Sequence, residues 1–175
     1  ASPLMLRGDL IWAESDTIPA TPPGNSTSTV QVLTGSTCVT CTVDPTATAN
    51  RTWLTGLTDW IPIEFGANYQ VKVWAASAGS ATPTQIGIPI FPDGSGNNDG
   101  WYFDYQAGVL HFIGSNIPSS IASPNVTNRI FVSGARYTGT IGFGQSENAN
   151  ITNAIINTAN ITTANIGNLN ITDNI

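Results

Sequence analysis

The residues that could support catalysis are few and scattered. His111 is the only histidine among 175 residues, and it stands in an apolar run, so we expect a strand residue rather than a general base. No GxSxG motif is present to place a nucleophilic serine beside it. Asp99 and Asp104 flank an aromatic run, as the carboxylates of a glycosidase would. Eleven acidic residues produce such neighbours by chance. We therefore predict no catalytic residues and no enzyme, with a depolymerase acting through Asp99 or Asp104 as the rival.

Two cysteines form a C-x-x-C motif, Cys38-Val39-Thr40-Cys41. A zinc site needs a second such pair or added histidines. A thioredoxin-type motif should begin a helix, whereas residues 37–43 are rich in β-branched side chains and typical of a strand. Two alternatives stay open, a short-range disulfide between Cys38 and Cys41 or two free thiols. The disulfide is the expectation, since it would staple a threonine-rich loop with little core of its own.

Residues 93–100, DGSGNNDG, carry oxygen-bearing side chains at alternate positions, as calcium loops do. The acidic residue that normally completes such a shell at the far end is missing. A connection between two strands needs the same glycines and asparagines for positive φ angles. We therefore interpret the segment as a loop and expect no metal and no cofactor.

The composition excludes several functional classes. Charged residues make up 9% of the chain, against about 25% in ordinary soluble domains, so long helices with charged outer faces are not expected. Lys72 is the only lysine and the net charge is −6, which argues against binding nucleic acid. A membrane-spanning helix needs a run of about 18 apolar residues. The sequence contains no such run, so no membrane span is expected. Five Trp, four Tyr and six Phe indicate a folded core rather than a disordered chain.

Six segments carry strand signals, namely 28–34, 69–75, 84–91, 101–105, 109–113 and 128–137. Several alternate apolar and polar side chains, and Gln106-Ala107-Gly108 between two of them predicts a tight hairpin. Gly, Pro, Asn and Ser separate the segments, and no convincing helix is present. The sequence therefore predicts an all-β domain over residues 29–140, built as an antiparallel β-sandwich or a small barrel.

Residues 1–28 are predicted to form an extended N-terminal arm. Leu10, Ile11 and Trp12 are its apolar anchors, and three prolines within residues 19–23 stiffen the stretch behind them. Such an arm could dock on a neighbouring molecule. The alternative is a strand that belongs to the domain behind it, and both stay open.

Residues 141–175 contain a repeat of five residues. Its isoleucines are Ile151, Ile156, Ile161, Ile166 and Ile171, a spacing that neither a helix nor a flat strand explains. A single-chain square β-helix would complete barely more than one coil, with no neighbours to cover the isoleucines. Three parallel chains could instead turn each row toward a common axis. We therefore predict a trimeric β shaft, and because the repeat stops midway at Ile175, we expect the polypeptide to continue.

The sequence also resembles a known family over residues 6 to about 140. The matching runs are LRGDLIWAESD (6–16), NRTW (50–53), TDWIP (58–62), FGANYQVKV (65–73) and, most densely, GSGNNDGWYFDYQAGVL (94–110). They resemble virion structural proteins of aquatic tailed phages, cyanophages among them, in which such a module precedes Asn/Thr-rich fibre repeats. The resemblance implies a virion fibre or appendage protein.

These observations lead to one expected function and one alternative. The expected function is a homotrimeric phage tail fibre in the virion, docked to other virion proteins through its arm and leading to a tip that recognises a host surface glycan. The alternative is a capsid-decorating adhesin whose β domain itself binds glycan through exposed tryptophans. The candidates for that contact are Trp53, Trp60, Trp74 and Trp101.

Overall fold

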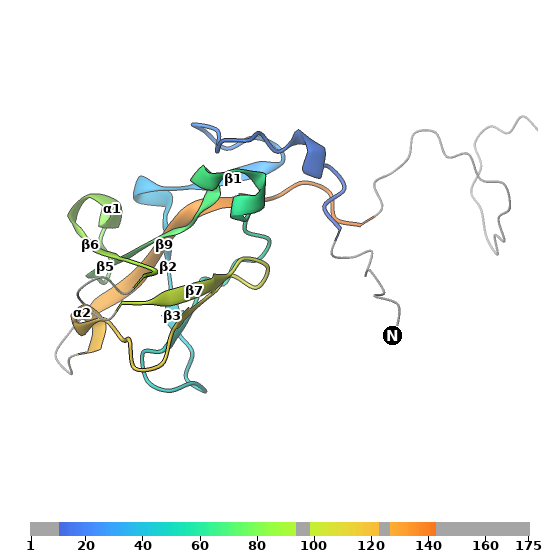
Figure 1. Cartoon of the computed structure of the whole chain (residues 1–175). Coiled ribbons are helices and arrows are strands. Elements are labelled where there is room, and N and C mark those ends of the chain that lie inside the picture. The colour runs from blue at the N-terminus through green and yellow to red at the C-terminus, as the bar shows by residue number, and fades with distance from the viewer. Residues whose placement is uncertain (1–10, 94–98, 123–126, 143–175) are drawn as a thin grey trace, which may run out of the picture. The chain divides into compact units, whose positions relative to one another are not determined.

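Strand β9 (Asn128–Tyr137) runs through the middle of a five-stranded antiparallel sheet. The computed structural model describes residues 11–93, 99–122 and 127–142. Along one edge β9 pairs with β1 (Val30–Leu33) and β2 (Val39–Thr40), and along the other with β5 (Lys72–Ser77). Strand β6 (Ile88–Ile90) lies beside β5 at the end of the sheet (Figure 1).

The second sheet has four antiparallel strands in the order β3-β4-β8-β7. Their bounds are Thr42–Val43 for β3, Thr52–Leu54 for β4, Trp101–Asp104 for β7 and Val109–Phe112 for β8. Strands β7 and β8 form the predicted hairpin. Gly108 in its turn has φ +67°, and an added Cβ would collide with the carbonyl oxygen of Leu57. Glycine is therefore required there for both backbone angle and space.

The facing sides of the two sheets enclose the main core. Its largest side chains are Trp53, Trp60, Trp101, Phe103 and Phe112. The Trp60 ring meets Phe103 edge-on at a centroid distance of 5.4 Å, and its indole N–H donates to the carbonyl of Leu57 at 3.1 Å. Residues from both sheets thus share one apolar interior, which makes the domain an all-β sandwich.

A smaller apolar cluster covers the other face of β9. Its members are Ile18, Val30, Ile61, Tyr69, Ala135 and Tyr137, with Trp12, Val32 and Phe65 packed against them. Side chains alternate along a strand, so β9 contributes Ile130 and Val132 to the main core and Ala135 and Tyr137 to this second core. Strand β9 is consequently buried on both faces.

The described part of the predicted arm belongs to the domain. Trp12 stacks on Tyr137 at 4.8 Å, and its indole N–H donates to Asp59 Oδ1 at 3.0 Å. The Ile11 carbonyl accepts a hydrogen bond from the Gly142 amide at 2.7 Å, and the Tyr69 hydroxyl donates to the carbonyl of Pro19 at 2.8 Å. Residues 11–28 therefore pack on the β domain, although apart from a bridge at Trp12 they form no strand. Trp12 is half-buried against the second core, and its role as a docking anchor stays a prediction.

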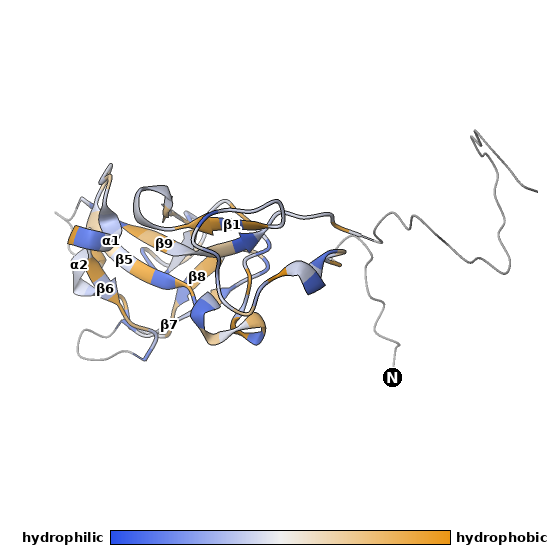
Figure 2. Cartoon of the chain, turned by 90° about the horizontal axis from the view of Figure 1, so that it is seen from above, coloured by the Kyte–Doolittle hydropathy of each residue, from blue (hydrophilic) through white to orange (hydrophobic). Residues whose placement is uncertain are grey.

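Helical structure in the described residues is limited to single turns. These are α1 (Pro83–Ile86), α2 (Ser119–Ala122) and the 3₁₀ turns η2 (Ser15–Thr17), η3 (Gly35–Thr37), η4 (Ile63–Phe65) and η5 (Ala67–Tyr69). The strand predicted over 84–91 is shorter than expected, since Pro83 begins a helical turn there. Among the described residues no helix is long and apolar enough to cross a membrane. Figure 2 shows the hydrophobic residues gathered on the strands.

Replacing Trp12 should test its place in the fold. We expect Trp12→Ala to lower the free energy of unfolding by about 2–3 kcal/mol, because a half-buried ring and its hydrogen bond are lost. Urea denaturation followed by tryptophan fluorescence measures it. The control is Tyr102→Ala, which removes a ring that is 55% exposed and should cost under about 1 kcal/mol. Equal effects would mean that residues 11–28 are not part of the fold.

The hairpin turn offers a second test with a matched control. Gly108 and Gly35 both have positive φ angles, +67° and +59°, but an added Cβ at Gly35 meets nothing within 4 Å. Gly35→Ala should cost about 1 kcal/mol from backbone strain alone. Gly108→Ala should cost at least about 2 kcal/mol more, since the turn must also move away from Leu57. Similar unfolding midpoints for the two variants would contradict the close approach.

Candidate functional site

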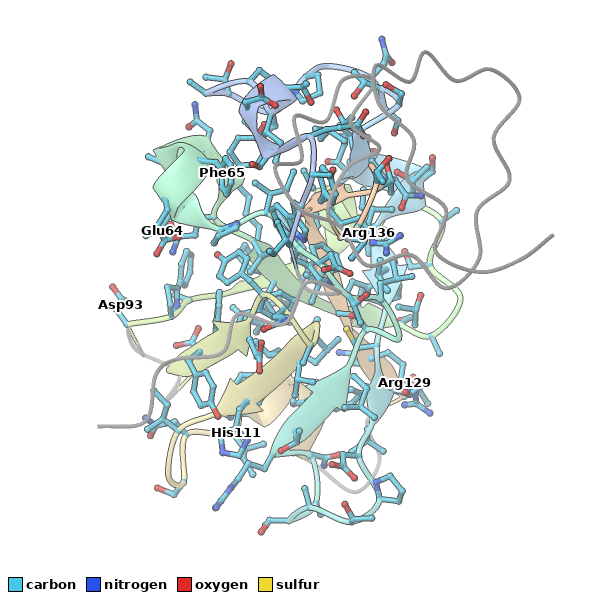
Figure 3. All side chains as sticks on the ribbon, turned by 90° about the vertical axis from the view of Figure 1, so that its right-hand side faces the viewer. Glu64, Phe65, Asp93, His111, Arg129 and Arg136 are labelled. Atoms are coloured by element: carbon cyan, nitrogen blue, oxygen red, sulfur yellow. The ribbon has the colours of Figure 1, made fainter. Side chains whose placement is uncertain are left out.

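The candidate catalytic residues have structural contacts. His111 Nδ1 lies 2.9 Å from Thr52 Oγ1 on the neighbouring strand, and its ring centroid is 5.3 Å from that of Tyr102. Asp104 accepts a hydrogen bond from the amide of Ala107 in the hairpin turn at 2.9 Å. Figure 3 shows Glu64, Asp93, His111, Arg129 and Arg136 well separated. Within the described ranges, no three His, Cys, Asp or Glu side chains are grouped as a metal site would need.

Asp99 is fully buried where β6 and β7 come together. Its Oδ2 accepts a hydrogen bond from the amide of Phe91 at 2.8 Å, which joins the end of β6 to the residues before β7. Its Oδ1 has no hydrogen-bond partner in the described part of the chain. The rest of the calcium-like loop, residues 94–98, lies outside the described residues.

The disulfide expected between Cys38 and Cys41 is not formed, and both residues are free cysteines. The backbone between them is extended through β2, and three residues of extended chain span roughly 10 Å. A disulfide needs Cα atoms closer than about 7 Å. Alternation also turns the two side chains to opposite faces, so Cys41 is buried in the main core and Cys38 is half-buried. Of the two alternatives, the structure has the free thiols.

Only one of the four candidate glycan-binding tryptophans is accessible. Trp53, Trp60 and Trp101 are buried at 3%, 0% and 6% exposure, all in the main core. Trp74 is half-buried on the outer face of β5, and its indole N–H donates to Ser133 Oγ at 3.4 Å. Burial therefore leaves Trp74 as the candidate from this set.

Trp74 lines a groove with a volume of about 670 Å³. The groove lies between residues 21–22 of the N-terminal segment, the start of β5 and the end of β6. Its lining residues are Thr21, Pro22, Ala67, Asn68, Gln70, Val71, Lys72, Val73, Trp74, Pro89, Ile90, Phe91, Pro92 and Trp101. Phe91 is 48% exposed, so the groove has a second accessible aromatic ring.

A second hollow of about 260 Å³ adjoins the first. The two share Pro22, Asn68, Gln70 and Lys72, and the second continues past Pro23 toward Ser133. Together they form one continuous depression, which we call the Lys72 groove. Its mixed lining of aromatic rings, prolines, amides and hydroxyls suits an extended polar ligand with apolar faces.

The charge in the Lys72 groove is of one sign. Lys72 lines both hollows, and among the residues that the structure describes no aspartate or glutamate lines either of them. Lys72 is exposed and has no ion-pair partner in the described structure. The sequence predicted part of this site, because the alternation of residues 69–75 places Gln70, Lys72 and Trp74 on one face of the chain. The contributions of Pro22 and Phe91 had no signal in the sequence, since folding brings them there from distant segments.

Other predicted site residues lie outside the described structure. These are Leu10 of the arm and the row Ile151, Ile156, Ile161, Ile166 and Ile171. Ile11 and Trp12 are described, and both take part in contacts within the β domain, as given above.

The free thiols can be checked by labelling. Burial raises the pKa of the Cys41 thiol most strongly, with the nearby Cys38 as a second cause, and partial burial also raises the pKa of Cys38. Iodoacetamide at pH 8 should therefore modify Cys38 much faster than Cys41 in the native protein, and both equally in urea. Peptide mass spectrometry reports each site, and an unreactive pair restored by reductant would contradict the free thiols.

The same burial links stability to pH. The folded state disfavours the Cys41 thiolate, so this contribution is fully present below the ordinary thiol pKa of about 8.5 and is lost as the pH rises above it. The unfolding free energy should accordingly decrease above that pH. The decrease should be smaller in Cys41→Ala, and an identical pH profile in that variant would contradict the linkage.

No family model, no curated protein and no solved structure matches this chain. The resemblance to phage virion proteins stays an expectation from the sequence.

Proposed function

We propose that this chain is a structural virion protein, the N-terminal part of a homotrimeric phage tail fibre. In this proposal the β domain is attached to the particle, the repeat forms the start of a shaft, and the fibre leads to a tip that recognises a host surface glycan. Neither an enzymatic reaction nor a cofactor is part of the proposed role.

The observation that carries the proposal is the isoleucine row at residues 151–171. A single copy of these five repeats leaves the isoleucine row uncovered, whereas three parallel copies can turn it toward a shared axis. Burying one isoleucine stabilises by roughly 1.5–3 kcal/mol, so five rungs of three chains could offset the conformational entropy lost on ordering the segment.

The two ends of the β domain support the proposal in a second way. Trp12 forms a β-bridge with Ile141, and the Ala13 amide donates to the Thr140 carbonyl at 3.0 Å. The residues around Trp12 and those around Ile141 therefore lie side by side on the β domain. The proposed docking contact is made by Leu10, Ile11 and Trp12, the apolar residues of the N-terminal arm.

Light scattering tests whether the chain is a trimer and whether the isoleucine row faces its axis. The purified chain should have a mass of about 55 kDa, three times 18.3 kDa. Ile161→Asn, in the middle of the row, should reduce the mass toward the monomer by burying three unpaired amides at the axis. The β domain should keep its near-UV circular dichroism.

Ile155→Asn is the matched control, since Ile155 stands beside the row but not in it. The light-scattering mass of this variant should stay close to that of the trimer, about 55 kDa. A wild-type mass of 18 kDa would overturn the trimer, and equal dissociation by the two variants would overturn the five-residue axis.

A second candidate function is glycan binding by the β domain itself, as in a capsid-decorating adhesin. The Lys72 groove favours it, because Trp74 and Phe91 offer accessible rings beside polar side chains. The two functions are compatible in one fibre, since three grooves on a trimer would strengthen a weak contact through effective concentration.

A further inference from the structure

We infer that the Lys72 groove binds an acidic oligosaccharide, with sugar rings packed on Phe91 and Trp74 and a sugar carboxylate at Lys72. This inference rests on the second candidate function, glycan binding by the β domain, and it names the ligand class. The groove is a depression with adjoining hollows of about 670 and 260 Å³, which favours several linked sugar units over a single small molecule.

Apolar contact in the groove comes from rings that the fold leaves uncovered. Phe91 is 48% exposed at the end of β6, and Trp74 is half-buried on the adjoining strand β5. Register places Trp74 opposite Pro89 on β6. A sugar ring has a face of C–H groups that can displace water from such aromatic surfaces.

Polar contact comes from side chains that have no partner of their own. Asn68 and Gln70 are exposed, and neither side-chain amide makes a hydrogen bond in the described structure. Each amide offers both a donor and an acceptor, which matches sugar hydroxyl groups. Gln70 and Lys72 share one face of the extended chain with Trp74, so hydroxyl, carboxylate and ring contacts follow one another along the groove.

Charge selects the acidic sugar over a neutral one. The chain carries a net charge of −6, which disfavours anions over most of its surface. In the Lys72 groove the balance is reversed, because one ammonium group is present and none of the lining residues in the described ranges is acidic. Asp93 follows the lining residue Pro92, and Asp99 stands two positions before the lining residue Trp101, but neither aspartate lines the groove. The Asp99 carboxylate is buried and accepts a hydrogen bond from the Phe91 amide.

Titration of the full chain with a hexameric oligogalacturonate tests the inference, with isothermal calorimetry as the measurement. The methyl-esterified hexamer is the matched ligand, since it keeps the rings and loses the carboxylate charge. We expect the acidic hexamer to bind, its affinity to fall with added salt, and the esterified hexamer to bind at least about fivefold more weakly.

Two pairs of variants locate the contact. Lys72→Gln should weaken binding of the acidic hexamer roughly fivefold or more. The control is Arg129→Gln, which removes an exposed cation on β9, four residues from Ser133, the residue paired with Lys72. This control should change the affinity less than about twofold. Phe91→Ala should weaken both hexamers, and Tyr102→Ala, another exposed ring, should weaken neither.

Each result has a distinct meaning. Equal binding of both hexamers, lost in Phe91→Ala, would overturn the acidic specificity and leave glycan binding by the β domain intact. Binding that Lys72→Gln and Phe91→Ala do not change would overturn the Lys72 groove as the site. No binding of either hexamer would overturn both the ligand class and the second candidate function, while the mass from light scattering would still decide the fibre proposal independently.

Discussion

Burial of β9 on both faces is the constraint on which the rest of the domain depends. A strand buried on one side only could leave its other side to water, but Ala135 and Tyr137 point away from the main core and are 1% exposed. Residues 11–28 supply part of the cover, with Trp12 and Ile18 in the second core. The N-terminal segment is therefore held on the domain by apolar burial, and the chain begins and ends the domain side by side at the bridge between Trp12 and Ile141.

The Lys72 groove is a consequence of the same cover. The N-terminal segment lines the groove with Thr21 and Pro22, and β6 pairs with β5 only from Val73 onward. Between these limits the outer face of β5 stays open at Gln70, Lys72 and Trp74. A proline-rich segment suits this border, because prolines fix the backbone and bring no amide donor that would need a partner. The fold thus creates one continuous polar depression beside apolar rings without a dedicated loop.

The fold class and the positions of most strands along the chain could be predicted from the sequence. Alternation marked β1 and β5, apolar and aromatic runs marked β7, β8 and β9, and Gly108 marked the hairpin between β7 and β8. These signals are local. The strand expected over 84–91 was partly wrong, since Pro83 starts a helical turn. Local alternation also placed Lys72 and Trp74 on one face, which is half of the Lys72 groove.

By itself the sequence determined the periodicities, the scarcity of charge and the presence of a single lysine. Each is a property of neighbouring residues or of the count of residues of one type. Only the tertiary structure decided which aromatic rings are accessible. Trp53, Trp60 and Trp101 face the partner sheet and are buried, whereas Trp74 faces outward. It also decided that Cys38 and Cys41 stand apart on an extended strand, and that Trp12 meets Tyr137 across 125 positions of chain. Such contacts depend on the packing of one layer on another, and no pattern within a single segment encodes them.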